Sequence, residues 1–350
     1  MPVARWIRYL ALAGVLLCFT VVVLGGYVRL TAAGLGCPDW PGCYGHVTPL
    51  GAAQSVTAQA AFPNKPLDVG KAWREMIHRY AASTLGFVIV VIAALAIADR
   101  RSRLVSPVYA LALFATVIFQ AILGMLTVIW QVTPPIVTLH LLFGLTTLGL
   151  LWWLWLSLPG DSWGSVRMQK AGWAALGGGG GGPAMETAHA LAIAGLVALG
   201  VQIALGGWTS SNYAAVACPD FPTCQHAWWP HTDYRNAFII WRGLGVNYEG
   251  GILDNPARVA IHLTHRMGAI VATLALSLAA IFVLVKPTLS NLRVQAAAVL
   301  AALALQLTIG ISMVLKTFPL RLATAHTAGA ALLLLAVLAL LRKTTLGAAR

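Results

Sequence analysis

Eight long stretches that are almost free of charged residues restrict the fold of this sequence more than any other feature. Each is about 20 residues long, which as a helix crosses the roughly 30 Å hydrocarbon core of a bilayer. Only 9% of the 350 residues are charged, against roughly 25% in soluble domains. Between the third and fourth stretches, Thr133-Pro134-Pro135 is expected to end a helix. The sequence therefore predicts an all-α integral membrane protein with helices over residues 9–28, 76–98, 107–130, 136–158, 187–208, 261–285, 294–315 and 322–341.

Basic residues gather in alternate connections and predict the orientation of these helices. Twelve of the 23 lysines and arginines lie at the chain ends and in three alternate connections: Arg5, Arg8, Arg100, Arg101, Arg103, Arg167, Lys170, Lys286, Arg293, Arg342, Lys343 and Arg350. Because a basic excess in short connections faces the cytoplasm, both termini are expected to be cytoplasmic. We expect a multi-pass protein surrounded by lipid in the bacterial cytoplasmic (inner) membrane. The same bias explains the net charge of +13, so no nucleic-acid partner is expected.

The second half of the chain repeats the first in three blocks. Gly25-Gly26 and the Cys37–Cys43 segment return 181 positions later as Gly206-Gly207 and the Cys218–Cys224 segment. His78-Arg79 returns as His265-Arg266 after 187 positions. A third block returns after 186 positions, with Gln120, Gly124 and His140 repeated as Gln306, Gly310 and His326. Three blocks in the same order predict a tandem duplication of four helices.

This duplication predicts two tandem four-helix bundles with pseudo-twofold symmetry about an axis along the membrane normal. The amino-terminal half is expected over residues 1–158 and the carboxyl-terminal half over residues 187–350. Between them, residues 159–186 contain a run of glycines at 177–182, which is typical of a flexible cytoplasmic linker.

Four histidines occupy repeated positions: His78, His140, His265 and His326. Each is expected about four to six residues inside the outer end of its helix, which places all four under about 10 Å from the outer boundary. Two imidazoles from two helices of a bundle suit the axial positions of a haem iron. Zinc would call for three or four ligands, and a di-iron oxygenase for histidine clusters at short spacing, of which the chain offers only His262 with His265.

The two halves differ beside the first histidine of each. Glu75 precedes His78 by three residues and shares its helical face, whereas His262 holds that position before His265. We interpret Glu75 as a proton donor or acceptor, with capping of the first helical turn as the alternative. Arg79 and Arg266 are candidates for pairing with haem propionates, with snorkelling to the interface as the alternative.

Two cysteine pairs fall in the long outer loops, Cys37 with Cys43 and Cys218 with Cys224. An oxidising compartment permits disulfides there. Two prolines lie between the partners of each pair and hold the turn tight, which is compatible both with a labile redox disulfide and with a structural clip.

The segments GGYVRLTAAGLGCPDWPGC, EMIHRY and HLTHR, with the helices of His140 and His326, resemble the haem A synthase family of cytochrome oxidase assembly. The resemblance covers nearly the whole chain and is weakest in the glycine-rich linker and over residues 48–71. Members of that family have two four-helix halves. They oxidise a methyl group of haem O to a formyl group, through successive hydroxylations, to give haem A.

The resemblance implies a role for each matching residue. It assigns Glu75 to catalysis, His78 and His140 to the substrate haem, and His265 and His326 to a haem b. It assigns Cys37 and Cys43 to electron delivery or haem transfer, and Cys218 and Cys224 match a pair found in some relatives. His262 lies one turn from His265 and is an alternative ligand, although His265 is preferred because an arginine follows it.

The leading hypothesis is therefore a membrane oxidoreductase that acts on haem O, with haem b as cofactor and haem A as product. Its expected partners are the haem O synthase that supplies the substrate and an unidentified electron donor, and a homo-oligomer is compatible with the sequence. The alternative is a di-haem b-type electron-transfer cytochrome. A transporter is disfavoured because the histidines lie near the outer boundary and not at the midplane.

Overall fold

The computed structural model describes residues 2–99, 105–158 and 182–348. Over those ranges the chain is helical without strands, and eight helices are long and apolar enough to cross a membrane. They are α1 (Pro2–Leu30), α4 (Val69–Ala98), α5 (Pro107–Ile129), α6 (Pro134–Ser157), α8 (Pro183–Ser211), α10 (Asn255–Val285), α11 (Arg293–Leu315) and α12 (Leu320–Ala348). The predicted all-α class and the eight helices are confirmed. Most of the predicted linker, and the basic residues Arg100, Arg101, Arg103, Arg167, Lys170 and Arg350, lie outside the described residues.

Several helices begin earlier than their apolar stretches, among them the two that carry His78 and His265. The N-terminus of α4 is capped by Asp68, whose carboxylate accepts a hydrogen bond from the Lys71 N–H at 2.9 Å. Helix α10 begins at Asn255 with Pro256 in its first turn, where proline costs no hydrogen bond. His78 and His265 therefore lie more than two turns inside their helices and not about four to six residues. Hydropathy missed these turns because they are polar.

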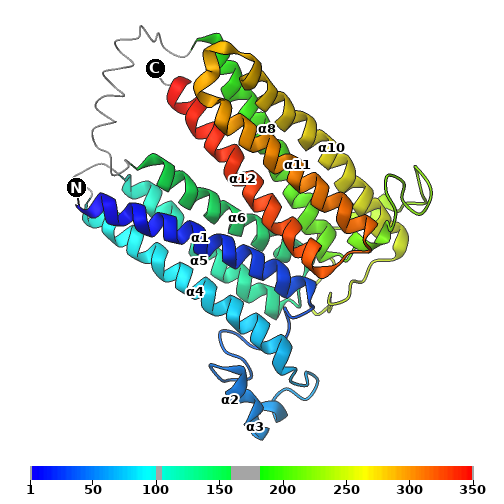
Figure 1. The fold of residues 1–350 in the computed structure, drawn as a ribbon. Helices are drawn as coiled ribbons and strands as arrows, with labels where there is room; N and C mark the ends of the chain where they lie inside the picture. Colours follow the sequence, from blue (N-terminus) through cyan, green and yellow to red (C-terminus); the bar gives the residue numbers. More distant parts are fainter. Residues whose placement is uncertain (1, 100–104, 159–181, 349–350) are drawn as a thin grey trace.

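Each half forms a ring of four helices (Figure 1). In the first half, α1 and α5 each pack against both α4 and α6. In the second half, α8 and α11 each pack against both α10 and α12. The helices that carry the repeated histidines are therefore opposite members of each ring, and their inner faces meet at its centre. The predicted pseudo-twofold relation between the halves stays a prediction.

The halves meet through α1 against α12 and through α6 against α8. Glycines allow close approach at both contacts. A Cβ on Gly26 would lie 3.1 Å from Thr327, and a Cβ on Gly207 would lie 3.1 Å from Thr138. Arg29 at the end of α1 donates to the Ser210 carbonyl of α8 and lies 3.9 Å over the Tyr213 ring.

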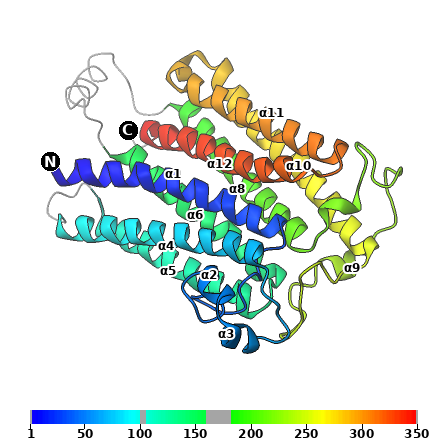
Figure 2. The same ribbon diagram turned by 60° about the horizontal axis from the view of Figure 1, so that its bottom comes forward.

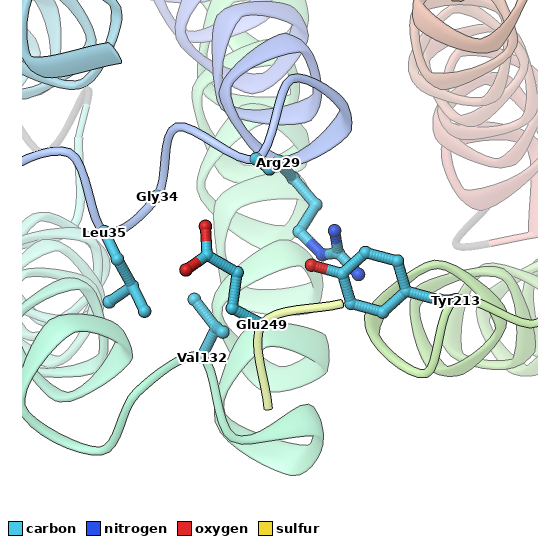
Figure 3. Close-up of a pocket in the computed structure, with 7 residues that line it drawn as sticks. Arg29, Gly34, Leu35, Val132, Tyr213 and Glu249 are labelled. Carbon is cyan, nitrogen blue, oxygen red and sulfur yellow. The ribbon is translucent and has the colours of Figure 1, made fainter. Parts of the chain in front are cut away.

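A long loop of the second half also reaches the first half. The Tyr248 N–H donates to the Gln131 carbonyl at 3.2 Å, and Glu249 forms an ion pair with Lys71 at 3.9 Å. Figure 3 shows Glu249 and Arg29 on the walls of one small cavity at this junction. The loop therefore joins the ends of the two bundles beside the first cysteine loop.

The chain termini lie at one end of the molecule and the cysteine loops at the other (Figures 1 and 2). The loop end carries three short helices, α2 (Pro49–Ala53), α3 (Val56–Ala60) and α9 (Tyr234–Ala237). Two 3-10 turns, η2 (Ala215–Ala217) and η3 (Pro287–Leu292), complete the described elements. The assignment of the loop end to the outer side of the membrane stays a prediction.

Candidate functional site

The first histidine pair meets at the centre of the amino-terminal ring. His78 of α4 and His140 of α6 have ring centroids 6.5 Å apart at an interplanar angle of 80°. The Nδ1 atoms of both rings are shielded from solvent and have no hydrogen-bond partner. Two imidazoles that face each other from opposite helices, each with a buried Nδ1 that has no partner, fit the two axial ligands of a haem iron.

The second pair occupies the equivalent place in the other ring. His265 of α10 and His326 of α12 come from opposite helices of the second ring. Unlike the first pair, these imidazoles contact glutamine side chains. The Gln202 amide lies 3.1 Å from His265 Nδ1, and the Gln306 amide lies 3.3 Å from His326 Nε2.

Each of the four imidazoles rests on a glycine of a neighbouring helix. A Cβ added to Gly25 would lie 3.0 Å from Cε1 of His78, and one added to Gly310 would lie 2.9 Å from Cε1 of His326. Gly124 and Gly206 stand in the same relation to His140 and His265, at 3.2 Å in both cases. Because a Cβ at any of these positions would crowd the imidazole, the glycines let the rings pack directly on the neighbouring helices.

These residues fit a haem held by two axial histidines in each half. The pairs come from opposite helices, their rings are fixed by glycines, and Nδ1 of His78, His140 and His326 is buried without a partner. Among the described residues, no group of three or more His, Cys, Asp or Glu side chains converges as a metal site. The zinc and di-iron alternatives therefore find no ligand cluster in the described part of the chain.

Glu75 joins the first histidine helix to the first cysteine loop. The Glu75 residue is 4% exposed, and its carboxylate forms an ion pair with Arg79 and accepts the Cys37 N–H at 2.9 Å. The Arg79 guanidinium also donates to the carbonyls of Asp39 at 3.0 Å and Gly42 at 2.6 Å. Asp68 caps α4, so the alternative that Glu75 caps the first turn is wrong.

In the second half the carboxylate is missing from this network. Arg266 donates to the loop carbonyls of Asp220 and Thr223, each at 2.8 Å. His262 takes the place of Glu75, is 5% exposed, and has its Nδ1 3.2 Å from the Ala214 carbonyl. Thus His262 already has a backbone partner, and both arginines bind loop carbonyls. Their pairing with propionates stays a prediction.

Both cysteine pairs form disulfides, with S–S distances of 2.05 Å for Cys37–Cys43 and 1.98 Å for Cys218–Cys224. An aspartate organises each loop by accepting two backbone N–H groups. Asp39 accepts those of Tyr44 and Gly45, and Asp220 accepts those of Gln225 and His226.

The charge of Asp220 is part of this loop structure. Slight burial works against ionisation, but hydrogen bonds from Thr223, His226 and Gln225 outweigh it and lower the pKa of the Asp220 carboxyl. A lowered folded-state pKa stabilises the loop above the ordinary aspartate pKa of about 3.9, and that stabilisation is lost as the pH falls through the folded value.

Replacing Asp220 by asparagine should therefore loosen the second loop at neutral pH. We expect a phosphine reductant to reduce Cys218–Cys224 about fivefold faster, the factor for one net hydrogen bond. Mass spectrometry after alkylation measures the rate. Asp233→Asn is the control, because Asp233 caps α9 in the same long loop without contacting the disulfide segment. Equal reduction rates in the two variants would contradict this role of Asp220.

Several functional residues in this region were not assigned from the sequence. The four ring-supporting glycines and the two loop aspartates recur at the offsets that revealed the duplication, with Gly25 and Gly206 separated by 181 positions and Gly124 and Gly310 by 186. That recurrence was the signal that could have identified them. No such signal marks Gln202, because position 21 in the first half is valine.

Comparison with known proteins finds similarity over nearly the whole chain. A family model described as "Cytochrome oxidase assembly protein" matches residues 8–338. A protein named "Heme A synthase" from Shewanella oneidensis is 38% identical over 331 residues, which are 94% of this chain and 93% of that protein. Proteins of the same name from Rhizorhabdus wittichii and Paracoccus denitrificans are 28% and 29% identical. They align with 96% and 91% of this chain and over 92% and 82% of their own lengths. The chain therefore belongs to the cytochrome oxidase assembly protein family.

Proposed function

We propose that this chain is a haem A synthase, a membrane oxidoreductase that converts haem O to haem A by oxidising a ring methyl to a formyl group through successive hydroxylations. The observation that carries the proposal is the facing pair of His78 and His140, with the buried carboxylate of Glu75 one turn away on the same helix. The family match and the relatives named "Heme A synthase" support the same activity.

The first half is proposed to hold the substrate. His78 and His140 would bind the iron of haem O, while Gly25 and Gly124 fix the two imidazoles. The Glu75 carboxylate binds one N–H of Cys37 and the guanidinium of Arg79, and its remaining lone pairs can accept or return a proton. We assign it the proton transfers that accompany hydroxylation.

The second half is proposed to hold haem b through His265 and His326. When bound, a haem with two imidazole ligands supplies one-electron redox chemistry. His265 is preferred to His262 because the His265 imidazole packs on Gly206 at the centre of the four-helix bundle. The His262 imidazole instead binds the Ala214 carbonyl. Arg266 keeps the second loop folded over this end of α10.

The first disulfide is proposed to take part in electron delivery or haem transfer. The reason is its position, because the Cys37 N–H binds Glu75 directly and Arg79 links that carboxylate to three carbonyls of the same loop. In the second loop no described carboxylate takes the place of Glu75. Cys218–Cys224 is therefore assigned a structural role.

The protein is proposed to lie in the bacterial inner membrane with its termini in the cytoplasm and its haem sites near the outer face. The haem O synthase is the expected source of substrate, and an electron donor is required. A di-haem electron-transfer cytochrome is not favoured, because the named relatives are synthases and because, among the described residues, only the first half carries the buried carboxylate.

The haem composition of the purified protein tests this function. We expect extraction and chromatography to yield haem b together with haem O or haem A when the chain is produced with a haem O supply. Pyridine haemochrome spectra give the amount of each. Haem b alone, at two per chain, would instead support the electron-transfer cytochrome.

The glycines under the imidazoles provide a second test. Gly310→Ala should displace His326, because the new Cβ would lie 2.9 Å from Cε1, and we expect haem b retention to fall about tenfold. Gly200→Ala is the control, since nothing lies within 4 Å of its Cβ and alanine favours a helix by about 1 kcal/mol. Haem b content measured by pyridine haemochrome separates the two. Full retention in Gly310→Ala would remove the steric argument.

A further inference from the structure

Gln202 of α8 is the one side chain that hydrogen-bonds both the ring and the backbone of a proposed haem ligand in the described structure. Its Nε2 lies 3.1 Å from Nδ1 of His265 and donates to the His265 carbonyl at 3.0 Å. Its Oε1 is buried and has no partner. The amide nitrogen also lies 3.4 Å from Nε2 of His265, so it contacts both ring nitrogens, while the unsatisfied oxygen lies beside Gly268.

The room for this side chain comes from Gly268, one turn after His265. A Cβ at Gly268 would lie 2.3 Å from Oε1 of Gln202 and 2.7 Å from Leu205, so no other residue is accommodated while Gln202 keeps its place. The repeat offsets place Val21 and Ala81 at the corresponding positions of the first half. The two halves therefore differ at both positions. Where the second half has glutamine and glycine, the first half has valine and alanine.

The first half consequently lacks this support. Position 21 offers His78 no side-chain hydrogen bond, only a backbone carbonyl of α1. Nδ1 of His78 has no hydrogen-bond partner. The imidazole that would bind the substrate haem packs on Gly25 and has only a backbone partner on α1, whereas its counterpart packs on Gly206 and contacts an amide side chain.

Ligation of a metal would give the spare acceptor a partner. A histidine that binds iron through Nε2 carries its proton on Nδ1 and must donate it. The amide oxygen and nitrogen of a glutamine exchange places by a simple rotation. In the rotated amide, Oε1 of Gln202 would accept the Nδ1 proton of His265, and the hydrogen bond from Nε2 to the His265 carbonyl would be given up in exchange. A hydrogen bond of this kind fixes the tautomer and raises the basicity of the ligand.

We propose that Gln202 is the positioning residue that makes the haem of the second half a retained cofactor, while Val21 in the first half leaves a haem free to enter and leave as substrate and product. This inference rests on the proposed function, because it takes His265 as a ligand of haem b. It predicts that the difference in how firmly the two halves hold haem is determined by Gln202 and by Gly268, which makes room for it.

The test uses the full-length protein purified with its haem. Gln202→Val installs the first-half residue, Gln202→Glu keeps an acceptor, and Gln295→Val is the control. Gln295 is a glutamine of α11 whose Oε1 is also buried without a partner, and it lies 11 residues from the Gln306 that contacts His326. Two quantities are measured, namely the rate of haem b transfer to excess apomyoglobin and the reduction potential of haem b.

We expect Gln202→Val to speed haem transfer about 10- to 100-fold and to raise the potential, because a less basic imidazole stabilises ferric haem less. Each tenfold change in the relative stability of the two oxidation states corresponds to about 59 mV. Gln202→Glu should retain haem b and lower the potential, and Gln295→Val should match the unsubstituted protein.

Equal transfer rates and potentials for Gln202→Val and Gln295→Val would overturn the role of Gln202 and leave the proposed function intact. If Gln202→Val does not accumulate in the membrane, Gln202→Glu decides the question, since rapid haem loss with a raised potential in that variant also overturns it. Purified unsubstituted protein that holds no haem b would overturn the proposed function itself.

Discussion

Replacing Glu75 by glutamine is expected to abolish haem A formation while leaving haem binding nearly intact. Glutamine has the same shape and still accepts the Cys37 N–H, so the loop should stay on α4. It cannot accept and return a proton as a carboxylate does, and general acid–base catalysis contributes about 10²- to 10⁴-fold. We expect haem A in extracted pigment to fall by at least about 100-fold.

The control for this variant is Glu186→Gln, which changes an exposed glutamate at the start of α8, at the opposite end of the molecule. It should form haem A normally. Chromatography of extracted haems measures product, and the absorption spectrum of the purified protein measures bound haem. Normal haem A in Glu75→Gln would show that the carboxylate is not required. Loss of all haem would show that Glu75 acts by holding the fold.

Substituting a histidine of one pair is expected to remove the haem of that half and to leave the haem of the other half bound. Alanine at His140 should remove haem O and haem A from the purified protein and leave haem b, because its imidazole faces His78 within the first half. Alanine at His326 should remove haem b and leave the first-half site. We expect a loss of at least about tenfold in the affected haem, since an axial ligand is removed outright.

Two further histidines serve as controls in this experiment. His189→Ala should change neither haem, because that ring contacts Thr344 at 3.1 Å, away from both sites. His262→Ala should leave haem b bound, because His262 binds a backbone carbonyl. Loss of haem b in His262→Ala with retention in His265→Ala would reassign the ligand. Loss of both haems in either His140→Ala or His326→Ala would mean that the halves do not bind haem independently.

The sequence alone predicted the class of fold because the hydrocarbon core imposes a length. Helices α5 and α11 end within one residue of their expected limits, since charge or proline marks their boundaries. The helix starts of α4 and α10 were missed because they are polar turns beyond the apolar stretch, specified by Asp68 and by Pro256. Hydropathy carries no information about such caps.

The candidate site was predictable where it is duplicated. The repeated offsets identified His78 and His265, and the break in the repeat identified Glu75. What the residues touch could not be derived from spacing, because long-range packing decides it. Arg79 and Arg266 bind the carbonyls of the cysteine loops, and Gln202 reaches His265 only through the room left by Gly268.

The most direct test of the central proposal is the identity of the haem made in cells that produce a haem O synthase with or without this chain. Chromatography and mass spectrometry of the extracted haems distinguish haem O from haem A. We predict that haem A forms only when the chain is present and disappears with Glu75→Gln. Haem O alone, in membranes that contain the full-length folded protein, would contradict the proposal.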